Sequence, residues 1–147
     1  MIVVDASLAV KWILFEAESD LANSFKSAFL NELSAPDLLS IEVTSAIVRK
    51  GNMGQIGSDD ALAALGEWTR ALLGHLVHLH PTTSRRLNES AKLALSMAHP
   101  FKDCIYLALA MELDCDLATC DEKFKDKAVH LYPRVRLLDE FSPERTK

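Results

Sequence analysis

The stretch that decides the fold is MIVVDASLAVKWIL, residues 1–14. Its first four residues are apolar and mostly β-branched, which predicts a short strand buried in a parallel sheet. Asp5 follows this strand directly, and residues 7–14 have the composition of a helix. Because open parallel sheets carry their functional sites beyond the carboxyl ends of the strands, we expect Asp5 to lie at such a site.

A second stretch, DLATCDEKF, repeats this pattern at residues 116–124. Residues 117–120 predict another short strand, Asp121 follows it, and a short polar helix is expected next. The two carboxylates should therefore emerge at the same edge of one sheet.

The rest of the chain alternates short apolar strands with amphipathic or buried helices. Helices are predicted over residues 7–14, 19–33, 36–50, 58–75, 84–98 and 102–113, and strands over 1–4, 33–35, 76–80, 117–120, 128–131 and 136–138. Gly51 is expected to end the third helix. This alternation favours an α/β layer fold with a mostly parallel sheet, in a single domain covering residues 1–147.

Composition excludes several classes of protein. No apolar stretch approaches the roughly 20 residues that span a bilayer, so no membrane segment is expected, and no signal peptide pattern is present. The three cysteines, Cys104, Cys115 and Cys120, match no zinc or redox spacing, which favours buried thiols in a reducing, cytoplasmic setting. A formal net charge of −5 argues against a nucleic-acid-binding protein, although a cluster of acids at a metal site would contribute to this charge.

Two further acids lie on helix faces that are otherwise apolar. Glu42 has Leu38 one turn before it and Ala46 one turn after it, and Asp103 shares a face with Leu107. A lone carboxylate in such a position is unfavourable unless it is paired, protonated or bound to a cation.

Each of the four acids also has a purely structural interpretation. Asp5 and Asp121 can cap helices, Asp103 can favour a helix N-terminus, and Glu42 can reach water or a basic partner such as Arg49. Four separate coincidences are less economical than one site that needs all four carboxylates.

Four converging carboxylates raise one another's pKa values unless a cation lies between them. Their oxygens suit Mg²⁺ or Mn²⁺, and Mg²⁺ commonly binds through a few carboxylates together with a substrate phosphate. Such a site can turn water into a nucleophile and stabilise charge on phosphorus. The four segments contain no histidine and only Cys104 and Cys120 as soft ligands, which favours a hard cation over zinc.

Four motifs resemble, in chain order, those of the PIN-domain family, and specifically of its VapC-type toxin ribonucleases. They are VVDAS with Asp5, APDLLSIEVTSAI with Glu42, FKDCIYLALA with Asp103 and LATCDEKF with Asp121. The resemblance covers nearly the whole chain, residues 1–141. By this resemblance Asp5, Glu42, Asp103 and Asp121 match the family's catalytic, metal-binding quartet, and Ser7 and Thr119 match positions where a hydroxyl supports that site.

The resemblance implies a three-layer α/β fold with a short, mostly parallel five-stranded sheet flanked by helices. It implies a Mg²⁺- or Mn²⁺-dependent endoribonuclease that hydrolyses RNA and is the toxin of a VapBC-type toxin–antitoxin pair. It further implies a VapB-like antitoxin as partner, and a homodimer.

A basic segment follows Asp121 and is expected to rim the site and hold an RNA backbone, with a plain solvated face as the alternative. Its cations are Lys123, Lys125, Lys127, Arg134 and Arg136, and Arg85 and Arg86 are a weaker candidate.

Two rival functions remain open at this level. One is a phosphatase resembling the haloacid dehalogenase class, with Asp5 as nucleophile, although Ser7 stands where the D-x-D pattern of that class has its second acid. The other is a non-catalytic partner-binding domain whose acids only cap helices.

Overall fold

Five short strands form one parallel sheet in the order β3-β2-β1-β4-β5 in the computed structural model, which describes residues 1–142. They are β1 (Ile2–Val4), β2 (Leu33–Pro36), β3 (His78–His80), β4 (Asp116–Thr119) and β5 (Val135–Leu137). Every neighbouring pair of these strands is parallel. The central strand β1 is buried throughout, as its apolar run predicts.

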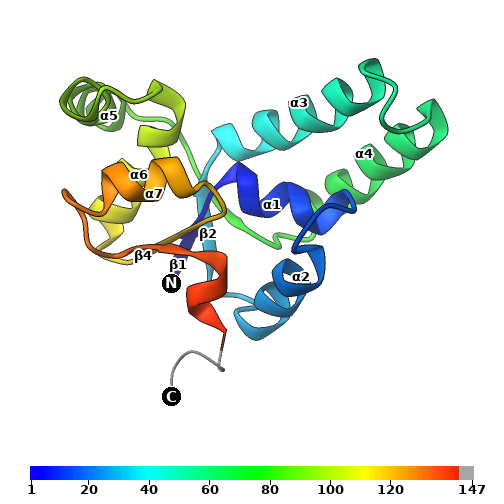
Figure 1. Ribbon diagram of the computed structural model, residues 1–147, viewed down its shortest axis with the longest axis horizontal. Coiled ribbons are helices and arrows are strands. Elements are labelled where there is room, and N and C mark those ends of the chain that lie inside the picture. Colours follow the sequence, from blue (N-terminus) through cyan, green and yellow to red (C-terminus); the bar gives the residue numbers. More distant parts are fainter. Residues whose placement is uncertain (143–147) are drawn as a thin grey trace.

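Helices cover both faces of this sheet (Figure 1). On one side lie α1 (Ala6–Ile13), α2 (Ser19–Ala28), α3 (Leu38–Asn52) and α4 (Ser58–Leu73), and on the other lie α5 (Ser84–Met97), α6 (Phe101–Leu113) and α7 (Glu122–Ala128). A short 3₁₀ helix, Leu138–Phe141, follows β5. This division is what right-handed crossovers produce when the chain first adds strands on one side of β1 and then on the other. The three-layer α/β fold predicted from the sequence is confirmed.

Two predicted elements differ from the structure because the chain turns earlier than its apolar pattern indicates. The helix predicted over residues 19–33 ends at Ala28, and Asn31 with a φ of 71° makes the turn that leads into β2. The strand predicted over residues 128–131 is wrong: Ala128 ends α7, and its carbonyl oxygen accepts hydrogen bonds from the N–H groups of Leu131 and Tyr132 at 3.0 and 2.8 Å. The last strand, β5, begins only at Val135.

The helix expected to end at Gly51 instead continues to Asn52, and Pro36 closes β2 rather than opening α3. A Cβ at Gly51 would lie 3.4 Å from the Cβ of Ala61, so this glycine lies where α3 and α4 approach each other closely. The left-handed turn is made further along, by Gly54 with a φ of 70°.

The α3 and α4 helices run side by side and project away from the sheet (Figure 1). Trp68 of α4 is 1% exposed, and its indole N–H donates to the Ser40 carbonyl oxygen of α3 at 3.3 Å. Within residues 1–142, no helix has both the length and the apolar character needed to cross a bilayer.

Because Trp68 anchors this projecting pair, we expect Trp68→Ala to lower the free energy of unfolding by about 3–5 kcal/mol. Leu62 lies on the same helix with 66% of its surface exposed, so Leu62→Ala is a matched control that should change stability by less than about 0.5 kcal/mol. Urea denaturation of the three proteins measures both values. Equal losses for the two variants would contradict the anchoring role of Trp68.

Candidate active site

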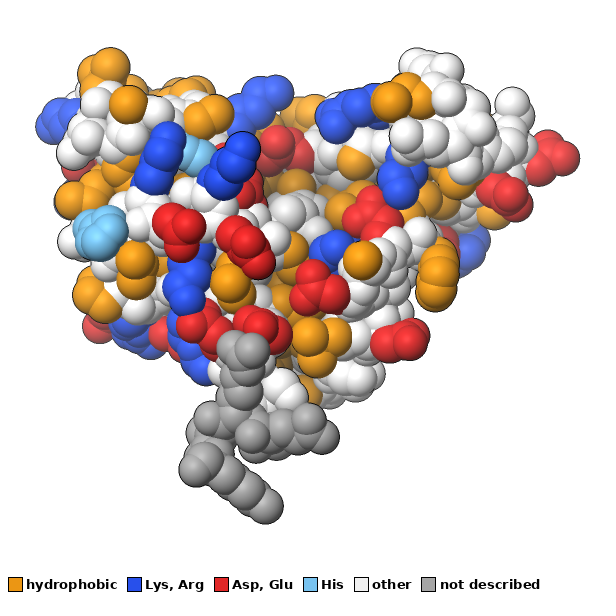
Figure 2. Space-filling view, in the orientation of Figure 1, with side chains coloured by type: hydrophobic (Ala, Val, Ile, Leu, Met, Phe, Trp, Pro, Cys, Tyr) orange, Lys and Arg blue, Asp and Glu red, His pale blue; other side chains and the backbone are white. Residues whose placement is uncertain are grey.

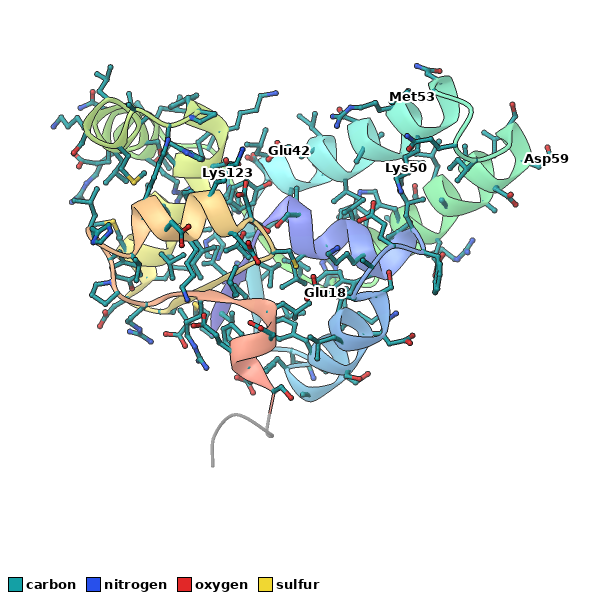
Figure 3. All side chains as sticks on the ribbon, in the orientation of Figure 1. Glu18, Glu42, Lys50, Met53, Asp59 and Lys123 are labelled. Atoms are coloured by element: carbon teal, nitrogen blue, oxygen red, sulfur yellow. The ribbon has the colours of Figure 1, made fainter. Side chains whose placement is uncertain are left out.

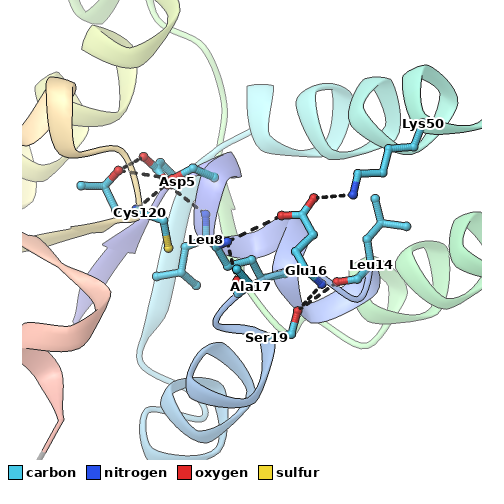
Figure 4. Close-up of polar contacts among 11 residues, drawn as sticks. Asp5, Leu8, Leu14, Glu16, Ala17, Ser19, Lys50 and Cys120 are labelled. Carbon is cyan, nitrogen blue, oxygen red and sulfur yellow. Dashed lines mark hydrogen bonds and ion pairs between the residues drawn. The ribbon is translucent and has the colours of Figure 1, made fainter. Parts of the chain in front are cut away.

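At the carboxyl end of β1, the Asp5 carboxylate accepts hydrogen bonds from three donors (Figure 4). It accepts from Ser7 Oγ at 2.6 Å, from the backbone N–H of Leu8 at 3.2 Å, and from Thr119 Oγ1. The bond from Leu8 makes Asp5 the N-cap of α1. The capping interpretation and the site interpretation of this residue are therefore compatible.

The pairing register of β1 and β4 explains why Thr119 reaches Asp5. Val4 pairs with Ala118, and the backbone N–H of Asp5 donates to the Ala118 carbonyl oxygen at 3.3 Å. The next residue of β4, Thr119, is thereby placed beside the Asp5 carboxylate.

Ser7 and Thr119, the two hydroxyls predicted to support the site, connect the ends of these strands. Ser7 Oγ accepts from the Cys120 N–H at 2.9 Å, and Thr119 Oγ1 accepts from the Asp121 N–H at 3.0 Å. The two hydroxyl oxygens are 3.3 Å apart. This network fixes the loop that presents Asp121.

Burial raises the pKa of the Asp5 carboxyl to about 6, against the lowering effect of its hydrogen bonds from Ser7, Thr119 and Leu8. The negative charge of Asp103 raises this pKa further. Asp5 is 5% exposed and forms no ion pair with another residue in the described part of the chain. A cation beside it would lower its pKa and offset the unfavourable burial.

Asp121 follows β4 by two residues, because the strand predicted over residues 117–120 ends at Thr119 and Cys120 lies between, whereas Asp5 follows β1 directly. The Oδ1 of Asp121 accepts from the Phe124 N–H at 3.0 Å, so that it caps α7 as Asp5 caps α1. The similar strand–acid–helix pattern of the two sequence stretches thus gives the same local structure twice.

The other two acids are each held by a side chain of the α5–α6 region. Tyr106 of α6 is 1% exposed and donates from its hydroxyl to Glu42 Oε1 at 2.7 Å. Burial, followed by the charge of Glu42, raises the pKa of Tyr106, so this hydroxyl remains a donor at neutral pH. His99 Nε2 lies 2.7 Å from Asp103 Oδ2.

All four acids line one open cavity of about 360 Å³. The side chains come from four places in the fold: Asp5 after β1, Glu42 on α3, Asp103 on α6 and Asp121 after β4. The structure therefore brings the four predicted site residues together, with Ser7 on the same wall. Their catalytic role stays a prediction.

The donor types around this cavity suit a hard cation. Burial raises the pKa of Cys104 to about 11 and that of Cys120 to about 12, so neither supplies a thiolate near neutral pH. As the side chains stand, no three histidine, cysteine, aspartate or glutamate residues of the described chain form a group that could hold a metal ion. Glu42 and Asp103 each have an oxygen engaged by a neighbour, Tyr106 and His99 respectively.

Most of the cations in the predicted basic segment pair with residues away from the acidic cavity. Lys125 pairs with Glu140, Arg134 and Arg136 pair with Asp116, and Lys127 donates to the Ala98 carbonyl oxygen. None of these cations lines the acidic cavity. Lys123 lies on α7 and extends toward the gap that Glu42 faces from α3 (Figure 3).

Arg49 and Lys50 line the cavity from α3. The sequence indicated Arg49 only as a possible partner of Glu42 and did not indicate Lys50. Lys50 Nζ lies 3.1 Å from Glu16 Oε1 (Figure 4), whereas Arg49 forms no ion pair with a residue in the described range. Figure 2 shows acidic side chains in the hollow between α7 and α3, with basic side chains on both sides of it. Arg49 and Lys50 follow Glu42 by seven and eight residues, about two helical turns, so they lie on the same side of α3 as Glu42. This spacing was the signal in the sequence that could have identified them.

A second cavity, of about 450 Å³, lies between α5 and α6 and includes Arg85 and Arg86, the other basic residues singled out in the sequence. The buried Arg86 guanidinium binds both oxygens of Glu112 at 2.9 and 3.1 Å and the Pro81 carbonyl oxygen at 2.8 Å. The charge of Arg86 is therefore neutralised by Glu112 within the protein.

Comparison of this chain with known proteins identifies its family and shows that solved structures share its fold. The family model described as "PIN domain" matches residues 2–129. No curated protein matches the sequence.

Three solved structures share the fold. VapC20 from Mycobacterium tuberculosis, described as a toxin that cleaves the sarcin–ricin loop, is 16% identical, with a TM-score of 0.68 over 86% of this chain and 94% of its own. A toxin–antitoxin complex from Klebsiella pneumoniae includes a chain that is 13% identical, with a TM-score of 0.67 over 92% of this chain and 97% of that one. PAE2754 from Pyrobaculum aerophilum is 19% identical, with a TM-score of 0.68 over 94% of this chain and 89% of its own.

The raised pKa of Asp5 predicts a pH-dependent stability difference in the metal-free protein. The unfolded carboxyl ionises near 3.8 and the folded one near 6, so the folded state loses stability as the pH rises through this window. Asp5→Asn lacks this effect, and its stability relative to the wild type should therefore increase by up to about 3 kcal/mol between pH 4 and pH 7. Chemical denaturation in chelator at several pH values measures the difference, and a pH-independent difference would contradict the burial effect.

Proposed function

Because this chain belongs to the PIN-domain family, we propose that it is a metal-dependent endoribonuclease and the toxin of a VapBC-type toxin–antitoxin pair. The observation that carries the proposal is the convergence of Asp5, Glu42, Asp103 and Asp121 on one open cavity at the carboxyl edge of the sheet. The shared fold of VapC20 and of the Klebsiella toxin–antitoxin complex supports the finer assignment.

Asp5, Glu42, Asp103 and Asp121 are the residues that would hold Mg²⁺ or Mn²⁺, because their oxygens are the hard ligands that these cations prefer. When bound, the cation would supply an activated water and stabilise negative charge on the phosphodiester. Ser7 and Thr119 keep the Asp5 carboxylate fixed, and Tyr106 keeps Glu42 directed to the cavity. Since no three acids among the described residues 1–142 form a ligand group as they stand, binding would require small carboxylate rotations or a share of ligands from substrate and water.

The RNA backbone is proposed to enter between α7 and α3. Arg49 and Lys50 line the acidic cavity, and Lys123 extends toward the same gap from the opposite side. Arg49 and Lys123 can contact phosphates on either side of the acids, and Lys50 can do so once it leaves Glu16. Such local contacts would offset the repulsion expected from a net charge of −5. The predicted RNA-binding roles of Lys125, Lys127, Arg134 and Arg136 have less support, because internal partners hold their charges.

A VapB-like antitoxin is the proposed protein partner, and a homodimer is the proposed assembly. Both follow from the resemblance of the four motifs, and the antitoxin is supported by the fold shared with the Klebsiella complex. Size-exclusion chromatography with light scattering tests the dimer.

The rival functions make different demands on the same residues. A phosphatase with Asp5 as nucleophile would need that carboxylate free to attack, whereas both of its oxygens accept hydrogen bonds from Ser7 and Thr119. A binding domain whose acids only cap helices accounts for Asp5 and Asp121 but gives no reason for Glu42 and Asp103 to line the same cavity.

The proposal predicts that the purified protein cleaves RNA with Mg²⁺ or Mn²⁺ and does not cleave it in chelator. Asp121→Asn should lower the cleavage rate at least about 100-fold, because it removes a negative charge from the site while keeping the shape. Asp126→Asn, on the exposed side of the same helix, is the matched control and should cleave like the wild type.

Sequencing the ends of the RNA products measures cleavage and its position together. Cleavage that survives both chelator and Asp121→Asn would contradict the proposal. Release of phosphate from a small phosphomonoester without RNA cleavage would favour the phosphatase, and absence of both activities with intact fold would favour the binding domain.

The proposed RNA path predicts which cations set the salt dependence of binding. On the uncleaving Asp121→Asn background, Arg49→Gln should weaken RNA binding and reduce the slope of log affinity against log salt by about 1, because it removes about one phosphate contact. Arg134→Gln, whose charge is paired with Asp116, is the control and should leave the slope unchanged. A slope that falls only in the Arg134 variant would place the RNA on the β5 side instead.

A further inference from the structure

His99 lies in the short link between α5 and α6, one helical turn before Asp103. Ala98 adopts the left-handed conformation, with a φ of 50°, and the backbone N–H of His99 donates to the Ala94 carbonyl oxygen at 3.1 Å. Pro100 is the N-cap residue of α6. The backbone position of His99 is therefore fixed on both sides.

We propose that His99 is a positioning residue of the candidate active site, which orients the Asp103 carboxylate within the acidic cavity. The inference rests on the proposed function, because it assigns His99 a part in the same site. Its direct observation is the 2.7 Å contact between His99 Nε2 and Asp103 Oδ2. The His99 side chain is 6% exposed and the Asp103 side chain 32%, so the contact joins a buried ring to the cavity wall.

The His99 ring also packs against an aromatic side chain. His99 and Phe124 stack with their centroids 5.1 Å apart and an angle of 30° between their planes. Phe124 belongs to α7, and its backbone N–H donates to Asp121 Oδ1. The stack therefore links the helix that carries Asp103 with the helix that Asp121 caps.

The Nδ1 atom of His99 argues against a role in packing alone. His99 Nδ1 is buried without a hydrogen-bond partner in the described part of the chain. A histidine kept only for packing is expected to pair both nitrogens or to be replaced by an apolar ring, because an unpaired buried polar atom is unfavourable. The tautomer with its proton on Nε2 donates to Asp103 and leaves only an acceptor unpaired at Nδ1.

The contact occupies Oδ2 of Asp103 and leaves Oδ1 without a donor in the described structure. Carboxylates that hold a cation are commonly fixed in this way by a second group, which limits their rotation. Orienting groups of this kind typically change metal affinity or activity 10- to 100-fold when they are removed. His99 thus has, for Asp103, the role that Tyr106 has for Glu42.

Two substitutions separate the hydrogen bond from the packing. His99→Phe keeps a ring that can stack on Phe124 but removes the donor, and His99→Gln keeps a donor near the position of Nε2 but removes the ring. Phe124→Leu is the control, because it weakens the stack and the core while leaving both members of the hydrogen bond in place. Thermal melts in chelator establish that each protein is folded.

The measurement is the affinity of the metal-free proteins for Mn²⁺, by calorimetry or by the electron paramagnetic resonance of free Mn²⁺. We expect His99→Phe to bind Mn²⁺ about tenfold or more weakly and to lower kcat on an RNA oligonucleotide with little change in KM. His99→Gln should recover most of the affinity, and Phe124→Leu should melt earlier but bind Mn²⁺ like the wild type. Wild-type affinity in a folded His99→Phe, or equal losses in His99→Phe and Phe124→Leu, would overturn the inference.

The experiments distinguish an error in the proposed function from an error in the role proposed for His99. If Asp121→Asn still cleaves RNA, or the wild type binds no Mn²⁺, the proposed function is wrong. If Asp121→Asn abolishes cleavage and Mn²⁺ binds the wild type but binds His99→Phe equally well, only the positioning role of His99 is wrong.

Discussion

The structure depends first on the burial of one carboxylate, Asp5, at the end of its central strand. A carboxylate with 5% of its surface exposed is unfavourable unless its oxygens accept hydrogen bonds, and Ser7, Leu8 and Thr119 supply them. These donors belong to α1 and β4, so satisfying one side chain requires the strand end, the first turn of the first helix and the neighbouring strand to meet at one point. The register of β1 against β4 cannot shift by one residue without separating Thr119 from Asp5.

The remaining acids follow the same principle with different partners. Glu42 is held by a tyrosine of a buried helix, Asp103 by a histidine of the preceding link, and Asp121 by the backbone of the helix it caps. All of these partners can be neutral, so they fix the direction of each carboxylate without neutralising its charge. The acids therefore stay available to a cation. Burial is the main reason why the pKa of Asp5 is raised, and the nearby charge of Asp103 raises it further.

Charge is distributed in a way that the net value of −5 does not show. The acids gather in a hollow, and basic side chains lie on both sides of it (Figure 2). A polyanion would be repelled by the chain as a whole, but it can be held locally where Arg49 and Lys50 stand next to the cavity. On this view Glu16, which binds Lys50, sets how easily that lysine becomes available to a phosphate.

The layer architecture and the four acids of the cavity could be predicted from local patterns in the sequence, because an apolar run that stops at a carboxylate and an acid on an apolar helix face can be recognised from neighbouring residues. The place of the last strand could not, since residues 128–131 also have the composition of a strand but β5 begins only at Val135. The sequence did not determine where helices stop short of their apolar pattern, since the turns at Asn31 and after Ala128 use backbone bonds that composition does not encode. The polar neighbours of the acids could be identified only from the folded chain. His99, Tyr106, Arg49 and Lys50 carry no distinctive motif, and Lys125, Arg134 and Arg136 looked available until their acidic partners were brought next to them. The physical reason is that hydrogen bonds and ion pairs depend on distances between residues far apart in the chain, and these distances exist only once the strands have paired and the helices have packed.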